Sequence, residues 1–273
     1  MASNDHMTPW RKVSTAVYTP PSDARIYGTV EADVTEVTEY ITAQRKQGNK
    51  LTMTHFVAAA IARTIYEDIP GINCFIRRGK VVMRDDAEVF VSVALERGKD
   101  MTGVLVPKTQ VLSVSEIAEY LYEEVQKKRS GEDTGAESFK STLAKIPWPF
   151  RRPVFLFVKW WMYDLGFKLP FLDAPRDPFG SVLLSNIGTH GLSTGMAALF
   201  PIGKVPAVLV MGKVTKKPVV IRDKVVIRSM MPLTATMDHR VMDGAQAGAL
   251  ARGIKRRLRH PETLDQPASF EEY

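Results

Sequence analysis

Strand-like and helix-like hydrophobic patterns alternate along most of this 273-residue chain, and no linker rich in proline, glycine and serine separates them. Residues 25–47, RIYGTVEADVTEVTEYITAQRKQ, show the change most clearly, because alternating apolar residues give way to apolar residues at helical spacing. The sequence contains no repeats and no low-complexity tracts. It therefore predicts one domain in which helices pack on a sheet.

The other elements follow from the same patterns. Helices are expected within residues 51–70, 113–131 and 243–258, and strands within 80–98 (two strands around a polar turn), 103–110, 180–188, 207–214 and 218–238. Ser113 and Glu116 have the spacing of a capping box at the start of the second helix. Hairpins mixed with helices predict an α/β fold on a mainly antiparallel or mixed sheet.

Composition is that of a soluble globular protein, with 45% hydrophobic and 25% charged residues. The one cysteine, Cys74, has no partner for an intramolecular disulfide and is expected as a small buried residue, which fits a reducing cytoplasm. The N-terminal MASNDHMTPW lacks the apolar core of a signal peptide, and zinc-site spacings of cysteine and histidine are absent. The net charge is +7, and many of the basic residues occur in clusters that contain no interleaved aromatic residues. Such clusters favour solvated faces or binding of small ligands that carry phosphates, and they give no indication of nucleic-acid binding.

Residues 145–172, KIPWPFRRPVFLFVKWWMYDLGFKLPFL, are apolar all round and hold three of the four tryptophans. The segment is too short, and too interrupted by Lys159 and Asp164, to span a bilayer. It is expected to form a buried or interface-forming helix, or else a face that docks on a membrane surface or a partner.

Residues 234–248, TATMDHRVMDGAQAG, place a histidine and two aspartates where an apolar strand is followed by a small-residue helix. His239 is either a catalytic base or a polar turn residue, and Asp243 either belongs to a site or caps the helix. The residues alone leave both interpretations open. His55 and His190 stand outside any motif and are expected as ordinary helix and loop residues.

The stretch DHRVMDGAQA resembles the H-x-x-x-D-G motif of the chloramphenicol acetyltransferase superfamily, in the form DHR-V/I-x-DGA of the dihydrolipoamide acyltransferase components of 2-oxo acid dehydrogenase complexes. That family carries T-I-S-N/S-L-G upstream of the histidine, and this chain has LLSNIG, with Ser185 54 positions before His239. Collinear matches cover most of the chain, from TVEADVTEV to VPAVLVMGKVTKKPVV. The sequence is therefore similar to the catalytic core of this family.

The resemblance implies a chloramphenicol acetyltransferase-like fold, a two-layer sandwich of a mixed sheet and helices. It also implies transfer of an acyl group between CoA and a thiol carrier of the dihydrolipoyl type. His239 would remove the thiol proton, because a thiol with a pKa of about 8.5 is largely protonated at neutral pH. The Ser185 hydroxyl would stabilise the oxyanion of the tetrahedral intermediate. CoA would be a substrate, and no metal is implied.

The family pattern gives the neighbouring residues supporting roles. Asp243 would organise the site by pairing with an arginine near the N-terminus, for which Arg11 is the matching candidate. Taken alone, Arg11 would be a surface charge. Asp238, Arg240 and Gly244 would hold the loop rather than react.

The resemblance further implies a homotrimer with its active site in a channel between subunits. His239 and Ser185 would come from neighbouring chains, with CoA entering from one side and the acyl carrier from the other. Larger cores of this family use an apolar C-terminal hook, whereas this chain ends in HPETLDQPASFEEY, so an isolated trimer is expected.

Residues 1–7 are set aside as a remnant of cloning, residues 8–260 form the expected catalytic domain with 145–172 as an apolar insertion, and 261–273 are expected as a polar tail. Lipoyl and peripheral subunit-binding domains are not recognised, so lipoate would have to come from a separate lipoyl-carrier chain, with dehydrogenase proteins as further partners.

Two other functions stay open at this stage. One is a small-molecule O-acetyltransferase of the chloramphenicol acetyltransferase type. The other is a non-catalytic assembly or docking subunit, although the candidate base and the candidate oxyanion donor are both present. A peptide-synthetase condensation domain shares the histidine motif but usually has a second histidine at the position of Asp238.

Overall fold

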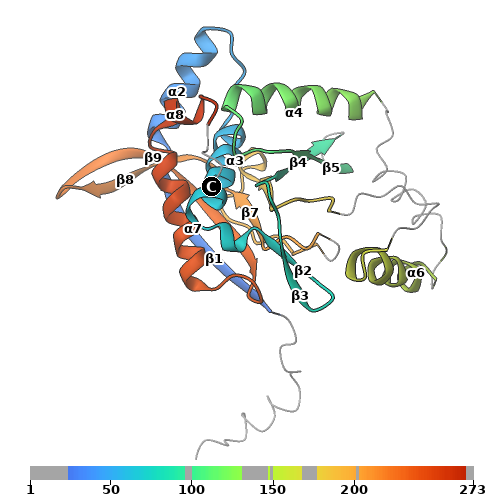
Figure 1. The fold of residues 1–273 in the computed structure, drawn as a ribbon. Coiled ribbons are helices and arrows are strands. Elements are labelled where there is room, and N and C mark those ends of the chain that lie inside the picture. Colours follow the sequence, from blue (N-terminus) through green and yellow to red (C-terminus); the bar gives the residue numbers. More distant parts are fainter. Residues whose placement is uncertain are drawn as a thin grey trace, which may run out of the picture.

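The computed structural model describes residues 24–95, 100–130, 147, 150–167, 177–200 and 203–268. Within them, seven strands form one sheet in the order β1-β9-β7-β6-β4-β5, with β8 paired to β9, and β2 and β3 form a separate hairpin (Figure 1). The strands are β1 Arg25–Asp33, β2 Cys74–Arg77, β3 Lys80–Met83, β4 Val89–Leu95, β5 Asp100–Val106, β6 Val182–Asn186, β7 Ala207–Met211, β8 Thr215–Ile221 and β9 Lys224–Asp238.

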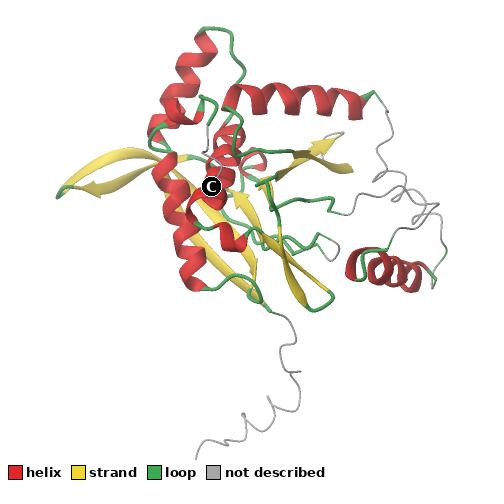
Figure 2. Cartoon of the chain, in the orientation of Figure 1, coloured by secondary structure: helices red, strands yellow, loops and turns green. Residues whose placement is uncertain are grey.

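Helices occupy most of the expected positions (Figure 2). They are α2 Thr35–Lys46, α3 Met53–Arg63, α4 Val114–Arg129, α6 Arg151–Val158, α7 Gly244–Arg257 and α8 Pro261–Leu264, with the π-helical turns η1 Thr64–Asp68 and η4 Lys159–Asp164 and the 3-10 turns η2 Pro70–Ile72 and η5 Gly188–His190. The capping box predicted at the start of α4 is confirmed, because the Glu116 backbone donates to Ser113 Oγ at 3.1 Å and the Ser113 backbone donates to Glu116 Oε2 at 2.7 Å.

The sheet is mixed, as the sequence predicted. Strands β4, β6 and β7 run parallel to one another, and the remaining neighbours in the sheet are antiparallel. The stretch 218–238 contains the end of β8, a turn and the whole of β9. The turn residues Arg222 and Asp223 both have positive φ angles, as a two-residue hairpin turn of this hand requires.

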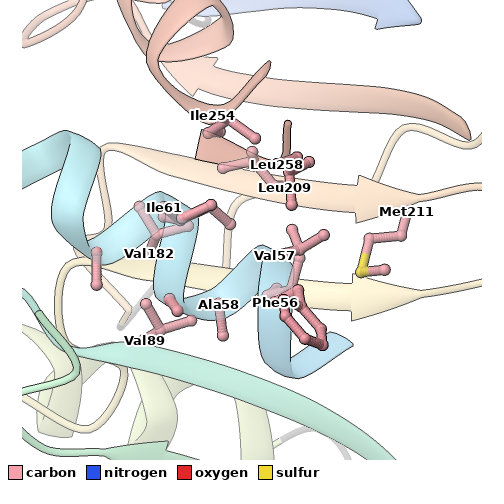
Figure 3. Close-up of a cluster of buried hydrophobic side chains, with 14 of the residues drawn as sticks. Phe56, Val57, Ala58, Ile61, Val89, Val182, Leu209, Met211, Ile254 and Leu258 are labelled. Carbon is pink, nitrogen blue, oxygen red and sulfur yellow. The ribbon is translucent and has the colours of Figure 1, made fainter. Parts of the chain in front are cut away.

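Helix α3 lies at the centre of the main hydrophobic core. Its side chains from Phe56 to Ala62 are fully buried between the sheet and the neighbouring helices (Figure 3). The run of alanines permits this close approach on every side, so α3 is buried all round rather than amphipathic. Cys74 is also buried, as predicted.

Two buried arginines connect the C-terminal helices α7 and α8 to this core through hydrogen bonds and an ion pair. The Arg63 guanidinium donates to the carbonyl oxygens of Thr263 at 2.8 Å and Gln266 at 2.6 Å, and Leu264 is buried. Arg257 pairs with Asp68 at 2.7 Å. The region expected as a polar tail thus begins as part of the fold.

Within the described part of the apolar segment, α6 runs on directly into η4 and lies at the margin of the molecule (Figure 1). It packs through Val158, Met162 and Tyr163, which make a small core of their own with Phe179. Among the described helices, none combines the length and the apolar character that crossing a membrane would require.

Candidate active site

Ser185 lies near the end of β6 and lines a cavity of about 1020 Å³. The walls come from β4, β6 and the helices α3 and α4, with Val91, Thr54 and Leu121 among the lining residues. The next residue, Asn186, is fixed to α3, because its side-chain amide donates to Thr54 Oγ1 at 3.1 Å. The cavity is therefore a preformed space with a hydroxyl group at its wall.

The chain after Ser185 is held by close backbone packing. Ile187 N donates to Met211 O at 3.0 Å, which ties the end of β6 to the end of β7. A Cβ atom at Gly212 would lie 1.8 Å from the Ser193 carbonyl oxygen, so only glycine permits this approach. The main chain that follows Ser185 is thus fixed by its packing against the end of β7.

His55 also lines the cavity, a role that sequence analysis missed. Burial lowers its pKa from 6.5 to about 4, so the imidazole is neutral near pH 7. Its Nδ1 accepts a hydrogen bond from the Thr52 backbone at 3.3 Å, in the geometry of a capping box at the start of α3. The spacing Thr52-x-x-His55 was the available signal, but glutamate and glutamine are the usual residues at that position.

His239 follows the last residue of β9 and its side chain is exposed. Its backbone is anchored on both sides of the strand end: His239 N donates to Ala24 O at 2.7 Å, and Asp238 N donates to Pro206 O at 2.9 Å. The strand pairing therefore fixes the start of the loop and presents the imidazole to solvent.

Asp238 and Arg240 hold this loop through one another. The Arg240 guanidinium bonds both carboxylate oxygens of Asp238 at 2.6–3.1 Å, and the Arg240 backbone donates to the same carboxylate at 3.0 Å. Burial opposes ionisation of Asp238, but these hydrogen bonds outweigh it, and the pKa of Asp238 is lowered. A carboxylate held in this way is suited to shaping the loop rather than to accepting a proton.

Asp243 caps α7. Its carboxylate accepts hydrogen bonds from the backbones of Ala245 at 2.8 Å and Gln246 at 3.3 Å, while the Gln246 side chain accepts from Asp243 N at 2.9 Å. Gly244 opens the helix in a position where an added Cβ would meet nothing within 4 Å. Arg11, the predicted partner of Asp243, lies outside the described residues.

The two candidate reacting side chains lie at opposite ends of the sheet. Ser185 is in register with Val210, which is in register with Thr234, five residues before His239. The intervening strand residues and strand spacings separate Ser185 from His239 by about 15–20 Å. A reacting atom must lie about 3 Å from both the base and the oxyanion donor. One chain alone cannot bring these two side chains to the same carbonyl group.

Two solved structures are similar to this chain in their fold. A probable dihydrolipoamide acetyltransferase from Listeria monocytogenes 4b F2365 superposes with a TM-score of 0.64 at 19% identity, covering 98% of this chain and 97% of that one. The cubic core of the pyruvate dehydrogenase multienzyme complex gives a TM-score of 0.64 at 18% identity, covering 89% of this chain and 84% of that one. The acyltransferase fold that the sequence predicted is confirmed.

Sequence comparison identifies the family. The model of the 2-oxoacid dehydrogenases acyltransferase catalytic domain matches residues 7–144 and 179–265, so the chain belongs to that family. A similar curated protein is the dihydrolipoyllysine-residue acetyltransferase component of the acetoin cleaving system of Bacillus subtilis (strain 168), 24% identical over 248 residues, which are 89% of this chain and 51% of the relative. The chain thus spans about half the length of that relative. Residues 145–178 lie outside the family match and include the apolar segment.

Proposed function

We propose that this protein is an acyltransferase that moves an acyl group between CoA and a dihydrolipoyl-type thiol, at a site completed by two copies of the chain. The observation that carries the proposal is the placement of Ser185 and His239 at opposite ends of one sheet. Ser185 lies at the wall of the cavity, and His239 lies in a loop held by backbone hydrogen bonds. A second copy that sets its His239 end against the Ser185 cavity would supply both groups to one carbonyl carbon.

In this site His239 acts as the general base. Its imidazole takes the proton from the attacking thiol while the sulfur bonds to the thioester carbonyl carbon. The carbonyl oxygen becomes an oxyanion, which the Ser185 hydroxyl stabilises by donating a hydrogen bond. When the tetrahedral intermediate collapses, the carbon–sulfur bond to the departing thiol breaks, and His239 returns the proton to that thiolate. No acyl-enzyme forms.

CoA would occupy the cavity beside Ser185. The cavity has the size of a ligand site, and its lining includes the basic side chains of Lys50 and Arg129. Cationic groups at a cavity rim favour a ligand that carries phosphates. The acyl carrier would approach from the His239 side, as a dihydrolipoyl group on a separate lipoyl-bearing chain, and we expect the reaction to take place in the cytoplasm.

The test is an acyl-transfer assay of the purified protein that pairs acetyl-, propionyl- and succinyl-CoA with free dihydrolipoamide, a separate lipoyl domain and chloramphenicol. Transfer to a dihydrolipoyl acceptor supports the proposal. Transfer to chloramphenicol alone would make the protein a small-molecule O-acetyltransferase, and no transfer with any pair would favour an assembly subunit. Light scattering should give about 92 kDa, the mass of three chains of 30.5 kDa.

A further inference from the structure

The helix formed by α6 and η4 turns an apolar face outward. The exposed large apolar side chains of this region are Phe150 (63% exposed), Val154 (38%), Leu156 (50%), Phe157 (53%), Trp160 (50%) and Phe167 (46%). On the opposite side, Val158, Met162 and Tyr163 are buried. The helix is thus apolar on both faces, although a surface helix normally points polar side chains outward.

The contrast with α4 shows that this is a local property. Helix α4 also has one buried face, with Val114, Ile117 and Leu121, but its exposed positions include Glu119 and Lys127. The outward residues Phe150, Leu156, Phe157, Trp160 and Phe167 are together called the aromatic face here. Three of them are joined by ring contacts: Phe157 contacts Trp160 at 6.3 Å between centroids, and Trp161, which contacts both, lies 5.0 Å from Phe167. Contiguous exposed apolar groups of this kind mark contact surfaces.

The charges around the aromatic face are positive. The described residues 150–167 contain three lysines and arginines, of which Arg152 is exposed, and one acidic residue, Asp164. That one carboxylate is neutralised by two lysines, Lys159 at 2.8 Å and Lys204 at 3.2 Å. The Arg78 guanidinium lies over the Phe167 ring at 5.1 Å and donates to Leu165 O at 2.9 Å, which adds a further cation. Within the described part of this segment, no unpaired carboxylate opposes an anionic surface.

The helix is also attached firmly to the body of the protein. Lys204 donates to the Tyr163 carbonyl and to Ile76 O at 3.0 Å, so it joins η4 to the β2–β3 hairpin. The aromatic face is therefore held in a fixed orientation relative to the sheet. Any surface that binds the aromatic face thus also orients the whole domain. Tryptophan, phenylalanine and leucine on one face with lysine and arginine beside them are the features of helices that lie in the plane of a bilayer surface.

We propose that the aromatic face of α6 and η4 binds the surface of an anionic lipid bilayer. The large side chains insert at the level of the headgroups, and the neighbouring cations contact the lipid phosphates. The family match stops at residue 144 and resumes at 179, so this contact belongs to the part of the chain outside the shared catalytic fold.

This orientation has a consequence for the His239 end of the sheet. A cavity of about 380 Å³ lies behind the helix, lined on one side by Lys159, Asp164 and Leu165 and on the other by Asp238 and Arg240. Membrane docking through the aromatic face therefore places the loop that carries His239 near the bilayer surface. Binding of the aromatic face to a bilayer does not require the proposed acyl transfer.

The test is co-sedimentation of the intact protein with two kinds of vesicle, one of phosphatidylcholine alone and one with phosphatidylglycerol added. The variant Phe157→Ser/Trp160→Ser removes two exposed anchors. The matched control is Val225→Ser/Ile227→Ser, which removes two side chains that are 73% and 72% exposed on the β8–β9 hairpin. The bound fraction of wild type should rise with phosphatidylglycerol content and fall with salt. The anchor variant should bind at least about tenfold more weakly, whereas the control should bind like wild type.

Three results would overturn the proposal. The first is absence of wild-type binding to phosphatidylglycerol vesicles at low salt. The second is equal loss of binding in the anchor variant and in the control. The third is a drop in the oligomer mass of the anchor variant in lipid-free solution, because the aromatic face would then be covered by another copy of the chain. Circular dichroism of both variants must match wild type, and the less drastic Phe157→Ala replaces the anchor variant if it does not.

Discussion

The Ser185 and His239 ends of the main sheet are held by different kinds of contact. At the Ser185 end, the backbone of the loop at Ser193 packs against Gly212 without room for a side chain, and a large cavity lies beside the hydroxyl group of Ser185. At the His239 end, two backbone hydrogen bonds and the Asp238–Arg240 pair hold a loop, and the imidazole is exposed. One end thus has a cavity beside its hydroxyl group, and the other has an exposed imidazole.

This difference supports our proposal that each chain holds two half-sites rather than one site. A base that worked within its own chain would be expected next to the cavity and partly buried, because exclusion of water strengthens the electrostatic interactions of a site. The exposure of His239 and its separation of about 15–20 Å from Ser185 instead fit a surface that another copy completes. Substitutions at each end change one half-site and leave the other intact.

The largest effect is expected at the His239 end. His239→Ala removes the proposed general base, so the rate of acyl transfer should fall about 10²–10⁴-fold while fold and oligomer mass stay intact. The matched control is His260→Ala, because His260 is also exposed and lies beyond α7. Steady-state kinetics and light scattering on both variants measure this. Near-full turnover of His239→Ala with every donor used by wild type would remove His239 from the mechanism.

At the Ser185 end, the expected loss is about a hundredfold or more in kcat for Ser185→Ala, with little change in the KM for CoA. The hydroxyl acts mainly on the oxyanion of the transition state, which is why binding should be spared. Ser229→Ala, on β9 away from both ends, is the control. If only the KM changed, Ser185 would be a residue that binds CoA and not one that stabilises the transition state.

Asp243 gives a smaller and more discriminating effect. Asparagine caps helices about as well as aspartate, so Asp243→Asn should keep the thermal stability of wild type, whereas Asp243→Ala should lose about 1 kcal/mol. Asp243→Asn would nevertheless lose the expected ion pair with Arg11. Activity should therefore fall about tenfold or more, since a hydrogen bond to a charged group contributes about 1.5–3 kcal/mol. Thermal melts and kcat/KM of both variants separate the two roles. Full activity in Asp243→Asn would leave Asp243 with the capping role alone and Arg11 with none.

The smallest expected effect concerns the neutral histidine of the Ser185 cavity. The pKa of His55 is lowered from 6.5 to about 4 in the folded protein, so below pH 6.5 the unfolded chain binds a proton that the folded chain does not. The free energy of unfolding should therefore decrease as the pH falls from 6.5 to 4, and this loss should be absent above pH 6.5.

His55→Gln tests this pH dependence, because glutamine keeps the capping-box spacing after Thr52 and does not titrate. The difference in Tm between pH 7 and pH 4.5 should shrink by about 2–4 °C for each kcal/mol of this contribution. An identical pH profile for His55→Gln and wild type would contradict the assignment of a buried neutral imidazole.

Local sequence patterns were sufficient for most of the elements, whereas the candidate site residues were identified by motifs shared with a known family. The change of period within residues 25–47 predicted β1 and α2, and the spacing of Ser113 and Glu116 predicted a helix start that the structure confirms. The order of the strands was not predictable in this way. Strand β1 pairs with β9, whose partner residues lie about two hundred positions away, and no local pattern carries that information.

Two features of the site also lay beyond local patterns. His55 became a cavity residue only because α3 packs against β4 and is bonded through Thr54 to Asn186 of β6, which the sequence around His55 does not specify. The separation of Ser185 from His239 depends on the registers of three neighbouring strands. The two motifs point to the same chemistry, but only the fold shows that they lie at opposite ends of the sheet.

The most direct test of the half-site account mixes two inactive variants. His239→Ala chains keep Ser185 and Ser185→Ala chains keep His239, so a site formed between one chain of each kind has both groups. Unfolding the two variants together and refolding them at equal amounts should restore about a quarter of wild-type sites, since random assembly pairs an intact base with an intact hydroxyl at that frequency. Each variant refolded alone should stay at about 1% of wild-type activity or less. Mixed oligomers that form, as mass spectrometry can verify, but show no activity above the separate variants would contradict a site shared between chains.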